Sequence, residues 1–450
     1  MTAALLLGIA LLAPIVSRRL TGDFFSPPAL AASAWCGTLG LFALRLLPYG
    51  PLQPATRALI AGTILCLVFG SALSAWWVAR RTRPRSDTIG QPRRPAWWVT
   101  GYAVAGLFGF AWYVFNVVAL LGWKGFADGY TLRDALFTYR IPSAFLFAQF
   151  FTIVAPLVAL AFVLGNTRLP KRVLILPMLC VLATLLSTDR TQFFMLVLTA
   201  SFMAVHRFGP ALSWPRVTGG LLVVGVLFLS LFVAIGWWRG ETAENSPLFL
   251  RLPGVDWVPG KGALPRTDVP RVVAYAGRAG QRLGYLYAYV TVSYPALDGL
   301  LRSPRPHAQG KYIFFPVLRA LQRSALLAID LPSQIPDSIL VSPPPAEGLP
   351  PLYLNQYSFL YYPLQDFGPP GALIYALAIG VIVGALYGWG YRGRADPLRL
   401  LLIGQTSAAV ALSPLVNKFN NTAWCYMVLL TGLPWTVAWL RSRRASGRTG

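Results

Sequence analysis

The chain has 450 residues, of which 56% are hydrophobic and 12% charged, and its formal net charge is +24. Soluble domains carry about twice that charged fraction, so the composition excludes an ordinary soluble protein and indicates an integral membrane protein. The basic charge alone would suggest nucleic acid as a partner, but most of it falls in short loops between apolar runs, where it indicates membrane orientation.

Apolar runs recur along the chain at about the 20-residue length that a helix needs to cross a bilayer. They predict about eleven spans, over residues 2–17, 27–48, 57–79, 96–122, 143–165, 173–188, 192–206, 217–237, 370–391, 398–415 and 423–440. The first run lacks a basic leader and a small-residue cleavage site, so we read it as a span.

The spans predict an all-α, polytopic membrane protein in three parts. Residues 1–238 are expected to form an N-terminal bundle of about eight helices, and residues 369–450 about three further helices with a basic tail. Between them, residues 239–368 are expected to form a large loop of short helices joined by Pro-rich segments.

The loops that follow the odd-numbered spans hold twenty basic residues and only Asp23, Asp87 and Asp396 as carboxylates. Because cytoplasmic loops carry an excess of Lys and Arg, this pattern predicts an outside N-terminus, a cytoplasmic C-terminus and an extracytoplasmic segment 239–368. The other twelve of the fifteen carboxylates fall on the outer side, so acid–base chemistry is expected there.

A short polar turn, Ser187-Thr-Asp-Arg-Thr-Gln192, separates two apolar runs and carries Asp189 and Arg190. An ionisable residue at membrane depth is costly to retain and is a functional-site hypothesis by default. The alternative is a turn that caps two helices while its arginine reaches water.

Two stretches of the large loop place arginines on one helical face. Arg278 and Arg282 are four residues apart, as are Arg319 and Arg323. The planar guanidinium donates two parallel hydrogen bonds to phosphate oxygens and stays charged, so these pairs are candidate diphosphate contacts. A solvated face or a contact with lipid headgroups is the alternative.

The large loop ends in Asn355-Gln-Tyr-Ser-Phe-Leu-Tyr-Tyr-Pro-Leu-Gln-Asp-Phe-Gly368, directly before an apolar run. Asp366 is a candidate general base for a sugar hydroxyl. Capping of the free N–H groups of the next helix is an equally good interpretation.

Among weaker signals, Asn417 and Lys418 occupy the last outer loop and are candidate sugar contacts. Metal-ligand, P-loop and dinucleotide motifs are absent from the sequence, and no cofactor is expected.

The ordered set of these pieces resembles the bacterial oligosaccharide repeat unit polymerases, the Wzy-type or O-antigen-polymerase-like family. The matching pieces cover roughly the second half of the chain. They are Asp189-Arg190-Thr191, Tyr294-Pro-Ala-Leu-Asp298, Phe315-Pro-Val-Leu-Arg319, Asn355-Gln-Tyr357-Ser-Phe359 and Asp366-Phe-Gly368-Pro-Pro-Gly371.

The resemblance implies a GT-C-like, metal-independent glycosyltransferase of the bacterial inner membrane that builds cell-envelope polysaccharide. It would transfer a growing glycan from undecaprenyl diphosphate to the non-reducing end of another lipid-linked repeat unit on the periplasmic face, alongside a flippase and a chain-length regulator.

Each candidate residue has an expected role in that reaction. Asp366 would act as base or base-orienting group and Asp298 as the second-choice base. The expected diphosphate contacts are Arg190, Arg278, Arg282, Arg319 and Arg323, and the expected sugar contacts are Asn355, Tyr357 and Tyr361.

Two other functions are compatible with the sequence. An O-antigen-ligase-like enzyme would move finished glycan to a separate acceptor. A transporter or flippase for a lipid-linked sugar would carry charged or broken helices near the bilayer midplane, whereas the charges here cluster at the outer face.

Overall fold

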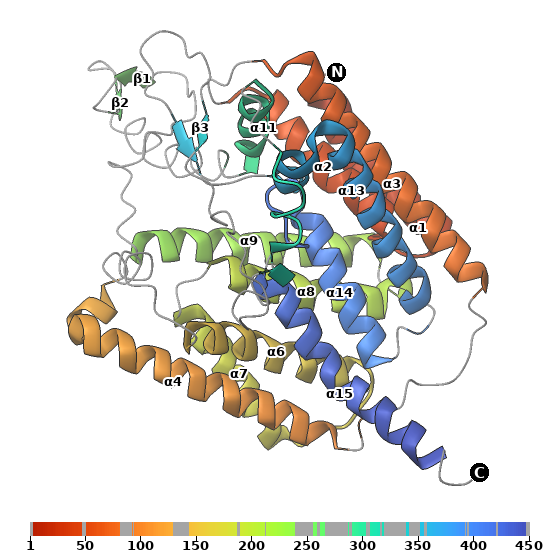
Figure 1. Ribbon diagram of the computed structural model, residues 1–450, viewed down its shortest axis with the longest axis vertical. Helices are drawn as coiled ribbons and strands as arrows, with labels where there is room; N and C mark the ends of the chain where they lie inside the picture. The colour runs from red at the N-terminus through yellow and green to blue at the C-terminus, as the bar shows by residue number, and fades with distance from the viewer. Residues whose placement is uncertain are drawn as a thin grey trace. The chain divides into compact units, whose positions relative to one another are not determined.

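The structure is a computed structural model. It describes residues 3–46, 51–81, 92, 94–128, 144–186, 190–211, 213–238, 255–258, 262–265, 287, 290–302, 307–315, 317–318, 339–341, 352–354, 358–391, 393, 396–419 and 422–446. Figure 1 traces the chain and labels its elements. Two compact units form from segments that are not contiguous in sequence. Unit 1 comprises Met1–Leu73, Glu241–Ile382 and Ala409–Asn421, and unit 2 comprises Ser74–Gly240, Val383–Ala408 and Thr422–Gly450.

A helix lies over each of the apolar runs. These helices are α1 (Ala3–Thr21), α2 (Pro27–Ala43), α3 (Pro54–Arg81), α4 (Pro95–Ala127), α6 (Ala144–Leu164), α7 (Lys171–Leu186), α8 (Arg190–Phe208), α9 (Trp214–Trp238), α13 (Tyr361–Tyr391), α14 (Pro397–Leu412) and α15 (Thr422–Ser446). A short 3₁₀ helix, η1 (Gly209–Ala211), follows α8.

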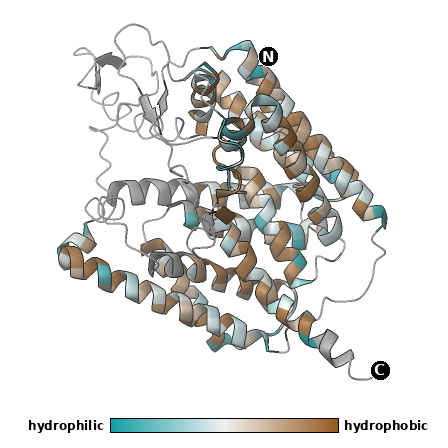
Figure 2. Ribbon diagram, viewed as in Figure 1, coloured by the Kyte–Doolittle hydropathy of each residue, from teal (hydrophilic) through white to brown (hydrophobic). Residues whose placement is uncertain are grey.

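Among the described residues, four helices are long and apolar enough to cross a membrane: α1, α3, α4 and α13. Apolar residues recur along the whole length of α4 (Figure 2), whose mean hydropathy is 2.0. The helical fold and the membrane character expected from the sequence are thus present in the structure.

The described parts of the large polar segment differ from the expected set of short helices. They hold α11 (Ser293–Arg302) and the first residues of α13, which are helical, and they also hold two antiparallel hairpins that were not expected. Strand β1 (Val255–Val258) pairs with β2 (Gly262–Pro265), and β3 (Ile339–Val341) pairs with β4 (Leu352–Leu354). The strands are short runs rich in Val, Ile, Leu, Trp and Tyr, residue types that favour extended backbone.

In unit 1, α3 and α13 approach backbone to backbone. A Cβ atom added at Gly70 would lie 2.9 Å from the carbonyl oxygen of Leu377, and one added at Gly380 would lie 2.9 Å from that of Leu67. Small residues permit such close packing of membrane helices, where van der Waals contact replaces the hydrophobic driving force.

Tyrosines tie the large segment to α2 in the same unit. Tyr287 donates a hydrogen bond of 2.6 Å to the carbonyl oxygen of Leu41, and its hydroxyl accepts one of 3.3 Å from the N–H of Leu46. The Leu41 carbonyl oxygen also accepts a hydrogen bond of 3.0 Å from the N–H of Leu44, so Tyr287 is attached at the C-terminal end of α2.

Unit 2 packs α4, α6, α7 and α15 through small and aromatic residues. Gly106 of α4 lies against the backbone of Phe151 and Thr152 in α6, and the rings of Phe162 and Trp435 stack at 5.2 Å. The buried His206 lies 2.9 Å from the Ser407 hydroxyl. This contact joins α8 to α14.

Candidate functional site

Asp366 is only 1% exposed and lies inside α13. The sequence predicts a span from about residue 370 and leaves two roles open for Asp366, a general base and a helix cap. In the structure α13 begins at Tyr361, and Ser358 supplies the hydroxyl that accepts a hydrogen bond from the N–H of Leu360 at 3.3 Å. The helix is kinked at Gly368, where φ is 69° and ψ is −170°, so a helical stretch lies on each side of this glycine. The Asp366 carboxylate binds N–H groups outside α13, which favours another role over capping.

The Asp366 carboxylate binds a segment more than fifty residues earlier in the chain. Its Oδ1 accepts a hydrogen bond of 3.1 Å from the N–H of Tyr312, and its Oδ2 accepts one of 2.7 Å from the N–H of Ile313. Hydrogen bonds to an ionised acceptor are about twice as strong as neutral ones. Both oxygens thus hold one short stretch of backbone, residues 307–315, which we call the 307–315 turn.

Main-chain contacts complete this attachment. The N–H of Ala308 donates to the carbonyl oxygen of Gln365 at 3.0 Å, and the N–H of Gln309 donates to that of Asp366 at 3.3 Å. Gly310 has a φ of 91°, in the left-handed region that favours glycine. The turn therefore follows a backbone path that lets successive N–H groups converge on the end of α13.

Three tyrosines gather where the turn meets α13. The ring of Tyr312 stacks on that of Tyr362 at 5.8 Å and lies 6.4 Å from that of Tyr361. Tyr361 is only 2% exposed, whereas Tyr312 and Tyr362 are half-buried. Tyr361, an expected sugar contact, is therefore the buried member of the cluster. The two half-buried tyrosines can present a ring and a hydroxyl to a ligand.

A second set of contacts joins this region to the loop after α14. The N–H of Phe359 donates to the carbonyl oxygen of Ser413 at 2.9 Å, and the Asn417 amide donates to that of Phe359 at 3.2 Å. Ser413 in turn accepts a hydrogen bond of 2.8 Å from the indole N–H of Trp35. Asn417 and Lys418 are both buried, so Asn417 acts within the framework of the site rather than at its surface.

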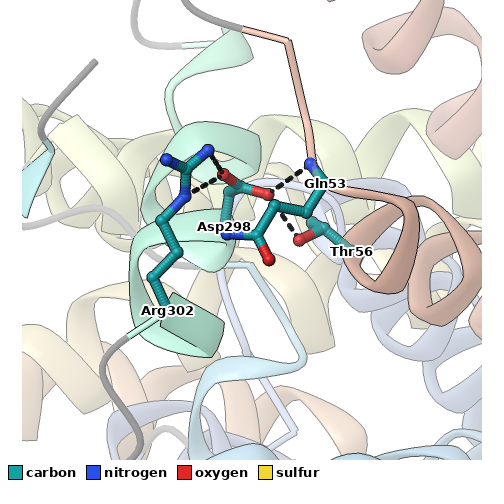
Figure 3. Close-up of polar contacts among 4 residues, drawn as sticks. All are labelled: Gln53, Thr56, Asp298 and Arg302. Carbon is teal, nitrogen blue, oxygen red and sulfur yellow. Dashed lines mark hydrogen bonds and ion pairs between the residues drawn. The ribbon is translucent and has the colours of Figure 1, made fainter. Parts of the chain in front are cut away.

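Asp298 of α11 is bound at the start of α3 (Figure 3). Its Oδ1 accepts hydrogen bonds from the N–H of Gln53 at 2.8 Å and from the Thr56 hydroxyl at 2.5 Å. Its Oδ2 accepts two from the Arg302 guanidinium, at 2.9 Å from Nε and 2.7 Å from Nη2. A buried carboxylate that accepts four hydrogen bonds is a tether between α11 and α3, and this geometry favours a structural role over proton transfer.

The remaining candidate residues lie mostly outside the described part of the chain. Arg190 is the first residue of α8 in unit 2, and only its backbone is described. The residues outside the described part are Asp189, Arg278, Arg282, Arg319, Arg323, Asn355 and Tyr357. Among the described residues, no group of three or more His, Cys, Asp or Glu side chains is placed to hold a metal ion.

Sequence reasoning missed Ser358, Tyr312, Tyr362, Trp35 and Ser413. Ser358 lies within the motif piece Asn355–Phe359, and Tyr312 and Tyr362 lie close to other pieces of the resemblance, so these three carry a usable signal. No protein-family model, no curated protein and no solved structure matches this chain.

Proposed function

We propose that the chain is a polysaccharide polymerase of the inner membrane, a glycosyltransferase that acts on the periplasmic face. It transfers a growing glycan from undecaprenyl diphosphate to the non-reducing end of another lipid-linked repeat unit. The observation that carries the proposal is the binding of the Asp366 carboxylate to the N–H groups of Tyr312 and Ile313. This contact attaches Asp366, the first residue of the motif piece Asp366–Gly371, to Tyr312 and Ile313, which shortly precede the motif piece Phe315–Arg319.

Contacts within unit 1 agree with the proposal that these loops lie on one side of the membrane. The large segment contacts residues 41–56 through Tyr287 and Asp298, and it contacts the loop after α14 through Phe359. Under the proposed topology of about eleven spans, all of these segments lie at the outer ends of their helices. A contact between an inner and an outer loop would have counted against that topology.

The proposed reaction divides the work between two kinds of residue. Arginines stabilise the diphosphate leaving group, whose negative charge develops as the bond to the sugar breaks. We assign this role to Arg190, Arg278, Arg282, Arg319 and Arg323. The acceptor hydroxyl is held beside the tyrosine cluster, where an aromatic face and phenol hydroxyls are both offered to a sugar.

For Asp366 the geometry favours the base-orienting role over that of the base itself. Each of its oxygens already accepts a backbone hydrogen bond, and the side chain is almost fully buried. We therefore assign Asp366 as a positioning residue that holds the 307–315 turn, and with it Tyr312, against α13.

Elongation in vitro tests the proposal. Purified protein in nanodiscs receives a polyprenyl-diphosphate-linked repeat unit with excess chelator, and product length is read on a gel. A ladder of increasing length is expected from the native protein. Attachment of glycan to an added lipid acceptor without any ladder would contradict the polymerase and point to the ligase-like enzyme.

Two variants then distinguish a loss of activity at the site from a general loss of folding. Asp366→Asn should shorten or abolish the ladder. Asp396→Asn serves as the matched control, because Asp396 is also buried and accepts hydrogen bonds from the N–H groups of Leu398 and Arg399, at the start of α14 in unit 2. Equal loss in both variants would assign the effect to folding and would count against a site at Asp366.

A further inference from the structure

Three large apolar side chains are exposed beside the Asp366 site. Phe314, Val317 and Phe367 are 57%, 58% and 46% exposed, and we call them the Phe314 patch. Both rings lie close to Gly310, where an added Cβ atom would lie 3.2 Å from Phe314 and 3.4 Å from Phe367. Val317 follows one turn later, and its N–H donates to the carbonyl oxygen of Phe314 at 3.0 Å.

The patch is fixed in place rather than carried on a free loop. The hydrogen bonds from Ala308, Gln309, Tyr312 and Ile313 attach the 307–315 turn to residues 365 and 366. Phe314 therefore has a defined position at the N-terminal end of α13.

The patch adjoins a helix that has the length and hydropathy of a membrane span, since Phe367 directly precedes the kink at Gly368 in α13. Beyond this kink, Ile374 and Ile382 are 69% and 54% exposed, whereas Leu377 packs against Gly70 of α3. Exposed apolar residues of a spanning helix contact lipid, so the Phe314 patch lies next to the end of a helix that presents such residues.

Cationic and polar groups border the patch on its other side. Lys311 and Gln309 are exposed in the same turn, and His307 is exposed next to Gly368. An apolar aromatic surface edged by basic residues suits the headgroup layer of a bilayer, where aromatic rings reach the acyl chains and cations meet lipid phosphates.

We propose that the Phe314 patch inserts into the interfacial layer of the bilayer at the N-terminal end of α13, with membrane lipid as its partner. Insertion holds the 307–315 turn, and the tyrosine cluster attached to it, at the membrane surface. The inference does not depend on the glycosyltransferase proposal, because it rests on exposure, attachment and continuity with α13.

Spin labels measure the depth directly. Single cysteines replace Phe314, Val317 or Phe367 in a chain whose four native cysteines are alanine, and each is labelled in nanodiscs of phosphatidylethanolamine and phosphatidylglycerol. Labels at the three positions should collide more often with oxygen than with a water-soluble nickel complex. Lys311→Cys is the matched control in the same turn and should show the opposite preference. Equal access of the nickel complex to all four labels would overturn the proposal.

A second measurement keeps the native cysteines in case their removal prevents folding. The full chain with Phe314→Cys or Lys311→Cys is treated with a membrane-impermeant maleimide, and the labelling of the unmodified protein is subtracted. Labelling should be at least about tenfold slower at position 314, because the reactive thiolate is disfavoured in an apolar layer. Equal labelling rates at the two positions would refute insertion.

Discussion

The Asp366 carboxylate accepts a hydrogen bond of 2.7 Å from the backbone N–H of Ile313, 53 positions earlier in the chain. The neighbouring N–H of Tyr312 donates to the other carboxylate oxygen. A single side chain thus fixes the position of the 307–315 turn on α13, which gives Asp366 a measurable effect on structure as well as on activity.

Asp366→Asn should loosen the 307–315 turn. An amide offers one oxygen instead of two, and its NH₂ group would face a backbone donor, so one N–H loses its partner at a cost of about 1–3 kcal/mol. We expect faster hydrogen exchange at the amides of Tyr312 and Ile313, measured by mass spectrometry in nanodiscs. In Asp396→Asn the same amides should exchange at the native rate, and unchanged exchange in Asp366→Asn would contradict the attachment.

Gly368→Ala should destabilise the start of α13. The φ of 69° and ψ of −170° at this position are a conformation that residues with a Cβ adopt at a cost of about 1–3 kcal/mol. The added Cβ would also lie 3.1 Å from His307 Cε1. A lower thermal unfolding midpoint in detergent is the expected result. Gly101→Ala is the control, since nothing lies within 4 Å of an added Cβ there. Equal midpoints for the two variants would argue against strain at Gly368.

The tether between Asp298 and α3 predicts that substitutions of Asp298 and of Arg302 lower the free energy of unfolding by unequal amounts. Asp298→Ala leaves the N–H of Gln53 and the Thr56 hydroxyl without their acceptor, which should cost about 2–4 kcal/mol in the free energy of unfolding. Arg302→Ala should cost less than Asp298→Ala, because the Arg302 side chain is 42% exposed and Asp298 keeps its hydrogen bonds with Gln53 and Thr56. Denaturant unfolding of the two variants compares them, and a larger effect of Arg302→Ala would refute the tether.

Tyr294 makes the stability of unit 1 sensitive to alkaline pH. Burial raises the pKa of this phenol above its ordinary value of 10.0, although the hydrogen bond with Thr38 opposes the shift. The unfolded chain therefore loses this proton first, and the stability contributed by the neutral phenol is full below pH 10 and is lost as the pH rises through the folded-state pKa.

The measurement for Tyr294 is the difference in unfolding midpoint between the native protein and Tyr294→Phe. The variant also loses the contact of 2.6 Å with the Thr38 hydroxyl, so it should be less stable at neutral pH. The difference should stay constant up to about pH 9 and shrink at higher pH, because phenylalanine does not titrate. A difference that grows with pH would show that the sign of the pKa shift is wrong.

The sequence by itself determined where the helices lie and that the protein belongs in a membrane. Apolar runs of sufficient length have few alternatives to a helix in a bilayer. The span predicted over residues 217–237, for example, corresponds to the helix Trp214–Trp238 in the structure. The span predicted from residue 370 corresponds to the part of α13 after the kink at Gly368. The helical residues Tyr361–Phe367 before the kink have no comparable signal in the sequence, because a distant turn completes their buried face.

Only the tertiary structure decided what the two candidate carboxylates do. Asp366 and Asp298 have similar surroundings in sequence, each with apolar neighbours and a nearby helix. Their partners lie 53 and 245 residues away, at Ile313 and Gln53. Hydrogen bonding between segments so far apart depends on how the helices pack, and no local pattern of residues encodes it.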